Sequence, residues 1–334
     1  MKRIRRLAVL VLLGALAMFA SPRADALTTC SATMTDITFG NVDPTGALVN
    51  ATATLNYSCT HTGGSLGGLY ASFVRMCFSI GSGAATGSTY NPRRMTNPSG
   101  DAMDFQLYRD SARSQIWGSV DNGTYPPLGR DLQFTILSNG QTVTGAATLY
   151  GRVPAGQIGL GVGSYTNVFS GIHTKFSYNV NEALLGLGTF PATCGNANLG
   201  AFPFTARADV QPQCRLTTAT ELDFGSVPGM LVANRDQTSA ISTTCTYRTA
   251  WQIGLDNGQH GLRRMTGVGS YAVNYELYRD SNHTLRWGNT LNTDTLAGSG
   301  TSTAQTVPVY GRVPPQTPVA AGNYSDIITV TVTF

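Results

Sequence analysis

The sequence predicts an all-β protein built from two tandem sandwich domains. Only 12% of the 334 residues are charged and 38 are glycine. Short runs of alternating apolar and polar residues lie between turn-forming residues, which is the pattern of short strands. Such strands favour packed sheets over helical or α/β folds, and the length fits about two domains.

Residues 1–26 are typical of a secretory signal peptide. A basic start is followed by an apolar run at 7–20 and an Ala-Asp-Ala cleavage site at 24–26. The run is shorter than the ~20 residues that a membrane span needs. We therefore expect export instead of a retained anchor, a mature protein that begins at Leu27, and no membrane span in it.

The positive net charge of the chain comes from this signal. Its removal leaves 22 − 5 = 17 basic and 18 − 1 = 17 acidic residues. A near-neutral chain with mixed charges has no basic footprint for nucleic acid or anionic lipid. We expect no nucleic-acid partner.

The rest of the chain contains an internal repeat. RRMT occurs at 93 and 263, LYRDS at 107 and 277, and WG at 117 and 287, all at an offset of 170. YGRVP recurs at 150 and 310. The repeat predicts two homologous domains, a first copy at 27–211 and a second copy at 212–334.

Residues present in both copies are interpreted as structural, because an active site would seldom be duplicated in full. No HExxH motif occurs and the cysteines are expected to be oxidised, so we expect no enzyme. This interpretation applies to the two YGRVP stretches and to Arg109, Asp110, Trp117, Arg279, Asp280 and Trp287.

All six cysteines lie in the exported part, where an even count predicts disulfides. The four cysteines of the first copy allow three pairings. The repeat aligns Cys30 and Cys59 with Cys214 and Cys245, which favours Cys30–Cys59 and Cys214–Cys245 and leaves Cys77–Cys194. No CxxC or HxxxH spacing occurs and the histidines are scattered, so we expect no metal or cofactor.

Taken together, these motifs resemble the spore coat protein U domain family. The resemblance is carried by a cysteine followed by FGNVDP or FGSVPG, a second cysteine, LYRD, WG, YGRVP and a closing alternating strand. It covers nearly all of the mature chain, twice. The family includes secreted coat proteins and subunits of archaic chaperone-usher pili.

The resemblance implies two immunoglobulin-like, pilin-like β-sandwiches in which a subunit lacks its final strand and borrows one from a neighbour. It also implies a periplasmic chaperone, an outer-membrane usher and an adjacent pilin subunit as partners.

The end of the second copy fits this expectation. In IITVTVTF the apolar face comprises Ile328, Val330, Val332 and Phe334. No sequence remains for another strand, so we expect these residues to form a donor-strand acceptor edge. An open sheet edge of this kind is prone to pairing with another chain.

The first copy, in contrast, continues past the matching strand around 172–180. In AFPFTARADV, at 201–210, five apolar side chains alternate with Pro203 and three polar residues, so this segment is predicted to be the copy's own last strand. Pro203 favours a strand end. Only three residues precede Cys30 in the mature chain, fewer than the ~5–6 of a typical strand. A subunit that receives a strand and gives none belongs at a tip.

Three loops are enlarged in or peculiar to the first copy, at 61–73, 119–131 and 181–194. We expect them to gather at the pole far from the second copy and to form an exposed apolar binding surface. The alternative is that they fold onto the core. A glycan site at YNPRR (90–94) and DNGTY (121–125) is also open. The proposed binding residues are Leu66, Leu69, Tyr70, Tyr125, Leu128, Leu184, Leu185, Leu187 and Phe190.

Together with these patterns, the resemblance implies the function of a tip adhesin subunit of an archaic chaperone-usher pilus. It would be secreted through the periplasm to the cell surface, attach to hydrophobic or host surfaces, and support biofilm formation. The alternative is a secreted spore-coat or matrix-type structural protein without specialised adhesion.

Overall fold

The computed structural model describes residues 27–334 except 65, 186 and 268, so the predicted signal peptide lies outside the described residues. The described residues form β-strands and two short 3-10 helices, with no α-helix among them. The all-β prediction is confirmed. No helix in this part of the chain is long and apolar enough to cross a membrane.

The strands fall into two groups along the chain. Those of the first copy are β1 (Leu27–Met34), β2 (Ile37–Asn41), β3 (Val49–Thr62), β4 (Tyr70–Ile80), β5 (Arg93–Thr96), β6 (Ala102–Tyr108), β7 (Leu128–Thr135), β8 (Thr142–Val153), β9 (Gly163–Phe169), β10 (Thr174–Leu184), β11 (Asn198–Gly200) and β12 (Phe204–Val210), with the 3-10 helices η1 (Leu66–Gly68) and η2 (Gly171–His173). Those of the second copy are β13 (Cys214–Ala219), β14 (Arg235–Cys245), β15 (Ala250–Leu255), β16 (Arg264–Thr266), β17 (Ala272–Asn274), β18 (Glu276–Tyr278), β19 (Leu296–Ser299), β20 (Ala304–Val313) and β21 (Val330–Thr333).

The first copy packs two sheets face to face. One has the strand order β1-β3-β8-β6-β5-β9-β12-β2 and the other β11-β10-β4-β7. Alternating side chains of both sheets meet in one core, which is rich in aromatic residues. Phe78 lies at its centre, with its ring stacked on Phe176 at 5.0 Å between centroids.

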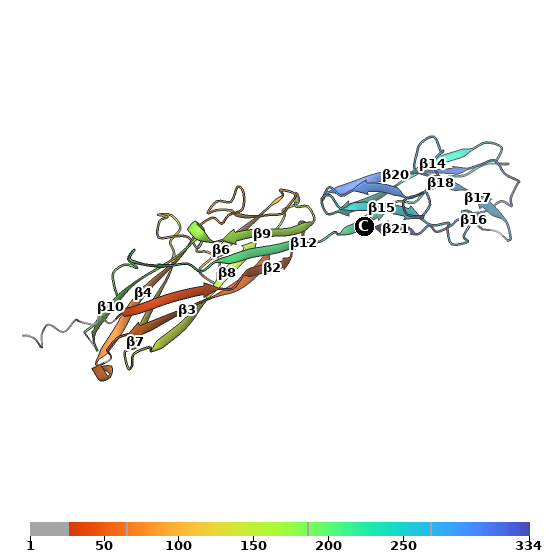
Figure 1. Cartoon of the computed structure of the whole chain (residues 1–334). Coiled ribbons are helices and arrows are strands. Elements are labelled where there is room, and N and C mark those ends of the chain that lie inside the picture. The colour runs from red at the N-terminus through yellow and green to blue at the C-terminus, as the bar shows by residue number, and fades with distance from the viewer. Residues whose placement is uncertain (1–26, 65, 186, 268) are drawn as a thin grey trace, which may run out of the picture.

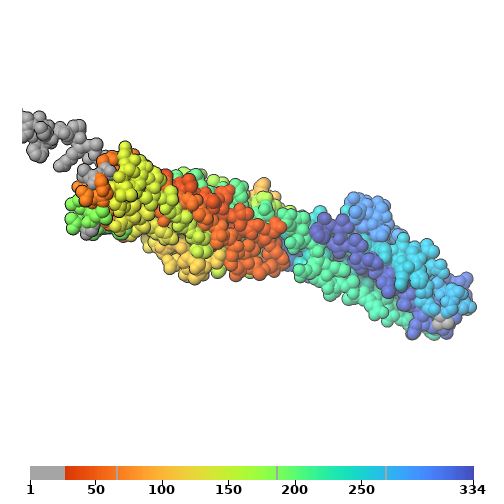
Figure 2. Space-filling view, turned by 90° about the horizontal axis from the view of Figure 1, so that it is seen from below, coloured from red at the N-terminus to blue at the C-terminus, as the bar shows by residue number. Residues whose placement is uncertain are grey.

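The second copy repeats this plan with fewer strands. Its sheets are β13-β14-β20-β18, β19-β15-β21 and the pair β16-β17. It has its own, smaller core. The two copies lie end to end in an elongated molecule, as Figures 1 and 2 show.

The repeated WG and LYRD motifs occupy equivalent structural positions in both copies. The indole of Trp117 donates a hydrogen bond to the carbonyl of Phe78, and that of Trp287 to the carbonyl of Ile253, each at 2.8 Å. Both tryptophans are fully buried. These motifs therefore serve the fold, as the sequence indicated.

The aspartate of each LYRD motif closes a tight turn. Asp110 accepts hydrogen bonds from the amides of Ser114 and Gln115, and Asp280 from those of Thr284 and Leu285. Desolvation opposes the ionised form of both carboxyls, but these bonds outweigh it and lower the pKa of Asp280 below its usual value.

The first arginine of each RRMT motif is buried and links several segments of its copy through hydrogen bonds. Arg93 donates to the carbonyls of Gly81 and Trp117 and to the side chain of Gln106. Burial lowers the pKa of Arg93 to about 9. Arg263 makes the equivalent bonds to the carbonyls of the second copy, including that of Trp287 at 2.7 Å.

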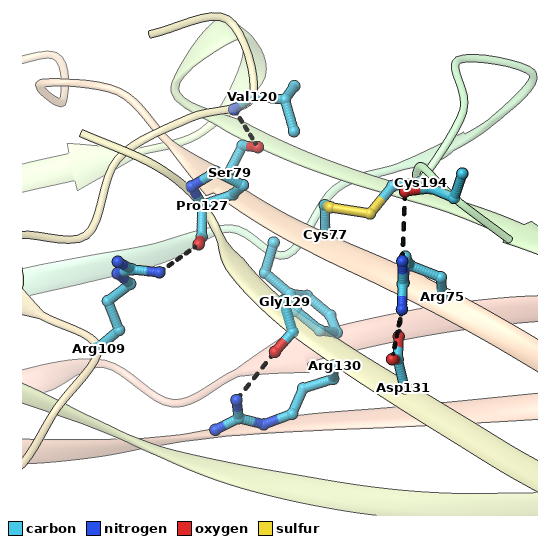
Figure 3. Close-up of a disulfide and its surroundings, with 12 residues drawn as sticks. Arg75, Cys77, Ser79, Arg109, Val120, Pro127, Gly129, Arg130, Asp131 and Cys194 are labelled. Atoms are coloured by element: carbon cyan, nitrogen blue, oxygen red, sulfur yellow. Dashed lines mark hydrogen bonds and ion pairs between the residues drawn. A yellow bond between two sulfur atoms is a disulfide. The ribbon is translucent and has the colours of Figure 1, made fainter. Parts of the chain in front are cut away.

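The three predicted disulfides, Cys30–Cys59, Cys77–Cys194 and Cys214–Cys245, are all present. Figure 3 shows the Cys77–Cys194 bridge beside Arg75, which donates to Asp131 and to the carbonyl of Ala192. Cys77 lies in the second half of β4. The bridge therefore joins the end of the 181–194 loop to the second half of that strand.

A short polar contact joins the copies. Arg248 pairs with Asp101 at 3.1 Å, and Gly161 forms an isolated parallel bridge with Tyr247. Only Gln211, Pro212 and Gln213 separate the last strand of the first copy from Cys214.

Candidate strand-acceptor groove and apolar pole

The AFPFTARADV segment closes the first copy. As β12 it lies between β9, to which it is antiparallel, and β2, to which it is parallel. Its side chains at Phe202, Phe204, Ala206, Ala208 and Val210 are at most 4% exposed. The predicted last strand is therefore confirmed, and Pro203 stands just before it, where no ladder hydrogen bond is required.

This closing strand completes the aromatic core. The ring of Phe204 stacks on Phe169 at 4.5 Å and lies parallel to Trp117 at 6.2 Å. Because β12 supplies a whole row of core side chains, the first copy needs no strand from outside.

The second copy has the neighbours of this strand without the strand itself. Residues 323–328 correspond to β9, because Ser325 pairs with Thr266 as Thr166 pairs with Thr96. Residues 222–226 correspond to β2. The described residues hold no strand between these two segments.

A glycine of the YGRVP motif confirms the correspondence of 222–226 with β2. A Cβ on Gly151 would strike Ile37 and Phe39, and one on Gly311 would strike Leu222 and Phe224. Each glycine thus lets the same pair of side chains pack closely over β8 or β20.

The missing strand leaves the second core partly open. Ile37, Phe39 and Tyr165 are buried in the first copy, whereas their counterparts Leu222, Phe224 and Tyr324 are only half-buried. The phenols of both tyrosines make the same bond four residues back, Tyr165 to Gly161 and Tyr324 to Ala320, each at 2.7 Å. The two copies therefore share the same arrangement of strands and core side chains, and they differ in that β12 covers these side chains only in the first copy.

Of the predicted acceptor residues, only Ile328 lies in the segment that corresponds to β9 and borders this opening. Val330 and Val332 belong to β21, which corresponds to β10 and pairs with β15 as β10 pairs with β4. Ile328, Val330 and Val332 alternate as half-buried side chains of one face and pack on the second core. Phe334 departs from the prediction. It is 56% exposed, because β21 ends at Thr333 and the ring reaches beyond the core toward the first copy.

At the other end of the molecule, exposed leucines gather where β4 begins and β10 ends. The amide of Leu185 donates to the carbonyl of Leu69, and Leu184 is paired with Tyr70 across the two strands. Leu27 and Leu137, which are not among the predicted binding residues, join them because β1 begins here and the β7–β8 turn closes here. We call this surface the apolar pole, formed by Leu27, Leu69, Leu137, Leu184, Leu185 and Leu187, which are 45–77% exposed.

Other predicted binding residues near the apolar pole are less exposed than its leucines. Tyr70 and Phe190 are half-buried, and Phe190 packs edge-on against Phe73. Nothing is described for the side chain of Leu66.

Two of the predicted binding residues are corrected. Leu128 is 3% exposed and belongs to the core. Tyr125 lies at the opposite end of β4, where the 119–131 loop is held by the bond from the Val120 amide to Ser79 (Figure 3). β7 is antiparallel to β4, so a loop that enters β7 lies at the end of β4 remote from the pole.

The glycan motifs meet at that remote end. The rings of Tyr90 and Tyr125 stack at 6.1 Å. Arg93 of YNPRR is buried and all three of its guanidinium nitrogens donate to groups of the first copy, so it is not free to bind a ligand.

A buried polar cluster supports the apolar pole from below. His61 is fully buried, and it and Thr28 both contact the carboxylate of Glu182. Ser72 donates to Thr28. Because these residues come from β1, β3, β4 and β10, the cluster fixes the strand ends that carry the leucines.

Among the residues that the structure describes, no three His, Cys, Asp or Glu side chains come together as metal ligands. The cysteines are all oxidised.

Two sandwiches, one closed by its own strand and one without that strand, define a tandem β-sandwich protein. The model of the Spore Coat Protein U domain family matches residues 16–170 and 201–331, and the chain belongs to this family. The second match begins at 201 and so includes β12. The family is named for a coat protein, and the chain is a structural, non-enzymatic protein.

Among curated proteins, the chain is similar to Protein U of Myxococcus xanthus, with 34% identity over 107 residues. The match covers 29% of this chain and 59% of that protein.

Three solved structures are similar over most of the chain at low identity. The complex of the chaperone CsuC with the tip adhesion subunit CsuE, from archaic chaperone-usher Csu pili of Acinetobacter baumannii, has 19% identity and a TM-score of 0.48, covering 92% of this chain and 100% of that one. The CupB6 tip adhesin of Pseudomonas aeruginosa has 11% identity and a TM-score of 0.35, covering 92% and 94%. A chaperone–tip adhesin complex of CFA/I fimbriae has 13% identity and a TM-score of 0.31, covering 90% and 95%.

Proposed function

We propose that this protein is the tip adhesin subunit of an archaic chaperone-usher pilus. One observation carries the proposal. The same sandwich occurs twice, and β12 fills in the first copy a position that stands open in the second. The second copy is thereby suited to accept a strand from another polypeptide by β-augmentation.

Backbone amides along one edge of the opening are available to hydrogen-bond with such a strand. The amide and carbonyl of Ser325 both bond to Thr266, so the backbone groups of its neighbours point the other way. Within the described residues, the amides of Tyr324, Asp326 and Ile328 have no hydrogen-bond partner. A strand laid here would satisfy them and cover the half-buried side chains of the second core.

The occupants of this position would change along the assembly route. A periplasmic chaperone would cover it first, and the adjacent pilin would replace the chaperone at the outer-membrane usher. Exchange of one strand for another at the same edge needs no change in the rest of the fold.

The position at the tip is supported by the way β1 and β12 are used. From Leu27 onward, β1 is paired with β3 of its own copy, and β12 closes the first copy, so neither strand is available to a neighbour. The apolar pole would face outward, and its leucines would attach the cell to hydrophobic or host surfaces and so support biofilm formation.

Attachment through many pili would compensate for weak single contacts. A few leucines give low affinity at one site, but many tips on one cell act together. The other candidate, a secreted coat or matrix protein without adhesive specialisation, is favoured by the similarity to Protein U.

A fusion tests the acceptor role. A flexible Gly/Ser linker and the segment NLGAFPFTARADV are added after Phe334 of the mature chain. We expect the free energy of unfolding of the second copy to rise by several kcal/mol, because each phenylalanine that becomes buried contributes about 1.5–3 kcal/mol. Hydrogen exchange at Tyr324, Asp326 and Ile328 should slow in the same protein.

The control fusion carries NLGASPSTARADV, with serine at both phenylalanine positions, and should give neither effect. A second copy that is already stable, and that gains nothing from the added segment, would count against the acceptor role and favour the coat-type alternative.

A further inference from the structure

A cavity of about 520 Å³ lies between the two copies. Its walls in the second copy include the Cys214–Cys245 bridge, Arg215 of β13 and the end residue Phe334. The first copy contributes residues 43–45, from the segment after β2. The cavity is therefore built by both copies, and neither the fold nor the acceptor edge as described above accounts for it.

The position of the cavity can be related to the path of the closing strand. In the first copy, β11 precedes β12 and pairs with β10, with Asn198 opposite Tyr178. The hydrogen bonds donated by the indoles of Trp117 and Trp287 show which residues of the two copies are equivalent here. Phe78, the acceptor of Trp117, is paired with Phe176, and Ile253, the acceptor of Trp287, is paired with Val332.

Val332 thus corresponds to Phe176, and Phe334, two residues on, corresponds to Tyr178. A strand that follows the path of β11 and β12 through the second copy would begin opposite Phe334. It would then run along residues 328 to 323 and leave at the end remote from the first copy. The residues of the donated strand that precede the one opposite Phe334 would enter the cavity.

We propose that this cavity binds the N-terminal end of the strand donated to the second copy. The inference rests on the proposed acceptor function. The occupant is identified by the repeat itself, because β12, which closes the first copy, directly precedes the first cysteine of the second. The strand that closes the second copy is accordingly the segment before the first cysteine of another chain of this family.

The lining suits a polypeptide backbone. Hydroxyl side chains of Thr45, Thr217, Thr246 and Ser302 surround the space. The three threonines already donate within the protein, so their oxygens can accept from peptide amides, whereas Ser302, which accepts from the Tyr247 amide, can donate to a carbonyl. Asn198 lies 16 positions before Cys214 (214 − 198). A donor that starts more than 16 residues before its first cysteine would therefore contact the first copy as well as the second.

Two peptides distinguish this site from the groove. The short peptide is NLGAFPFTARADV (residues 198–210), and the long one is GNANLGAFPFTARADV (residues 195–210). Binding of each to the mature chain is measured by calorimetry. We expect the long peptide to bind about tenfold more tightly, since its three added residues can form one or two further hydrogen bonds in the cavity.

Matched variants assign the difference to the cavity. Thr45→Trp fills the space from the first copy and should abolish the advantage of the long peptide without changing the affinity for the short one. Ala47→Trp places the same side chain on an exposed residue of the same segment that does not line the cavity, and should change neither.

Equal binding of both peptides by the unmodified protein overturns the inference and leaves the acceptor function standing, as does an advantage that survives Thr45→Trp. Failure of both peptides to bind overturns the acceptor function and the inference together.

Discussion

At the scale of single residues, the closing strand acts through the side chains it adds to the first core. Phe204 is 4% exposed and stacks on Phe169. Its neighbour Thr205 faces the other side of the sheet and is half-buried. The two residues differ in what they touch, although they share one strand.

We predict that Phe204→Ala destabilises the first copy by about 3–5 kcal/mol, because it leaves a cavity between two aromatic rings. Thr205→Ala should change stability by no more than about 0.5 kcal/mol. Denaturant unfolding of the mature chain, followed at the transition of the first copy, measures both. Similar losses for the two variants would show that β12 contributes through its backbone and not through its buried face.

At the scale of elements, the repeated motifs form the frame on which the open edge depends. The Asp280 turn leads from β18 back to Trp287, whose indole donates to β15, the partner strand of β21. Its carboxylate accepts the amides of Thr284 and Leu285. The pKa of Asp280 is lowered in the folded state, so its contribution to stability is complete above the unfolded pKa of about 3.9 and is lost as the pH falls through the lower folded pKa.

Asp280→Asn should therefore lower the melting temperature of the second copy at pH 7, and the difference from the unmodified protein should shrink toward pH 3. Thermal unfolding between pH 2.5 and 7 tests this. Glu221→Gln removes a charge from an exposed position of the same copy and serves as the control. A difference that stayed constant down to pH 3 would exclude the carboxylate as its source.

The elements also show how far the sequence could lead. The repeat predicted the disulfides and the structural role of Trp117 and Trp287, because identical residues at a fixed offset imply identical surroundings. The alternation in 201–210 predicted β12. Loop length, however, carries no information on which end of a sheet a loop occupies, so Tyr125 was assigned to the wrong end.

Burial inside a loop could not be predicted either. Leu128 reaches the core because β7 begins at that residue, whereas the loop composition suggested a free surface. Leu27 and Leu137 were missed because they are distant in sequence from the other leucines and meet them only through strand pairing. The cavity at the junction depends on contacts between two copies that the repeat does not specify.

At the scale of the whole molecule, the apolar pole and the open groove lie at different copies of an elongated chain. Figure 2 shows the C-terminal residues on the surface of the second copy, reaching the junction with the first, while the pole lies at the outer end of the first copy. The two sites can be altered separately.

We predict that Leu184→Asp combined with Leu187→Asp weakens adsorption of the mature protein to an alkyl-coated surface at least about tenfold, because two exposed apolar contacts are replaced by charges. Ile172→Asp is the matched control, since Ile172 is 93% exposed but lies between β9 and β10, away from the pole. Adsorption isotherms measure both. An equal loss with the control would mean that overall hydrophobicity, and not the pole, governs attachment.

The short connection between β12 and Cys214 has a mechanical consequence. β12 runs lengthwise between β9 and β2, and only three residues link it to the second copy (Figure 1). Tension that pulls the copies apart would be carried along β12, so its hydrogen bonds to both neighbours would bear the load together instead of opening one after another. The segment that completes the first core is then also loaded in shear, and it transmits force from one end of the molecule to the other.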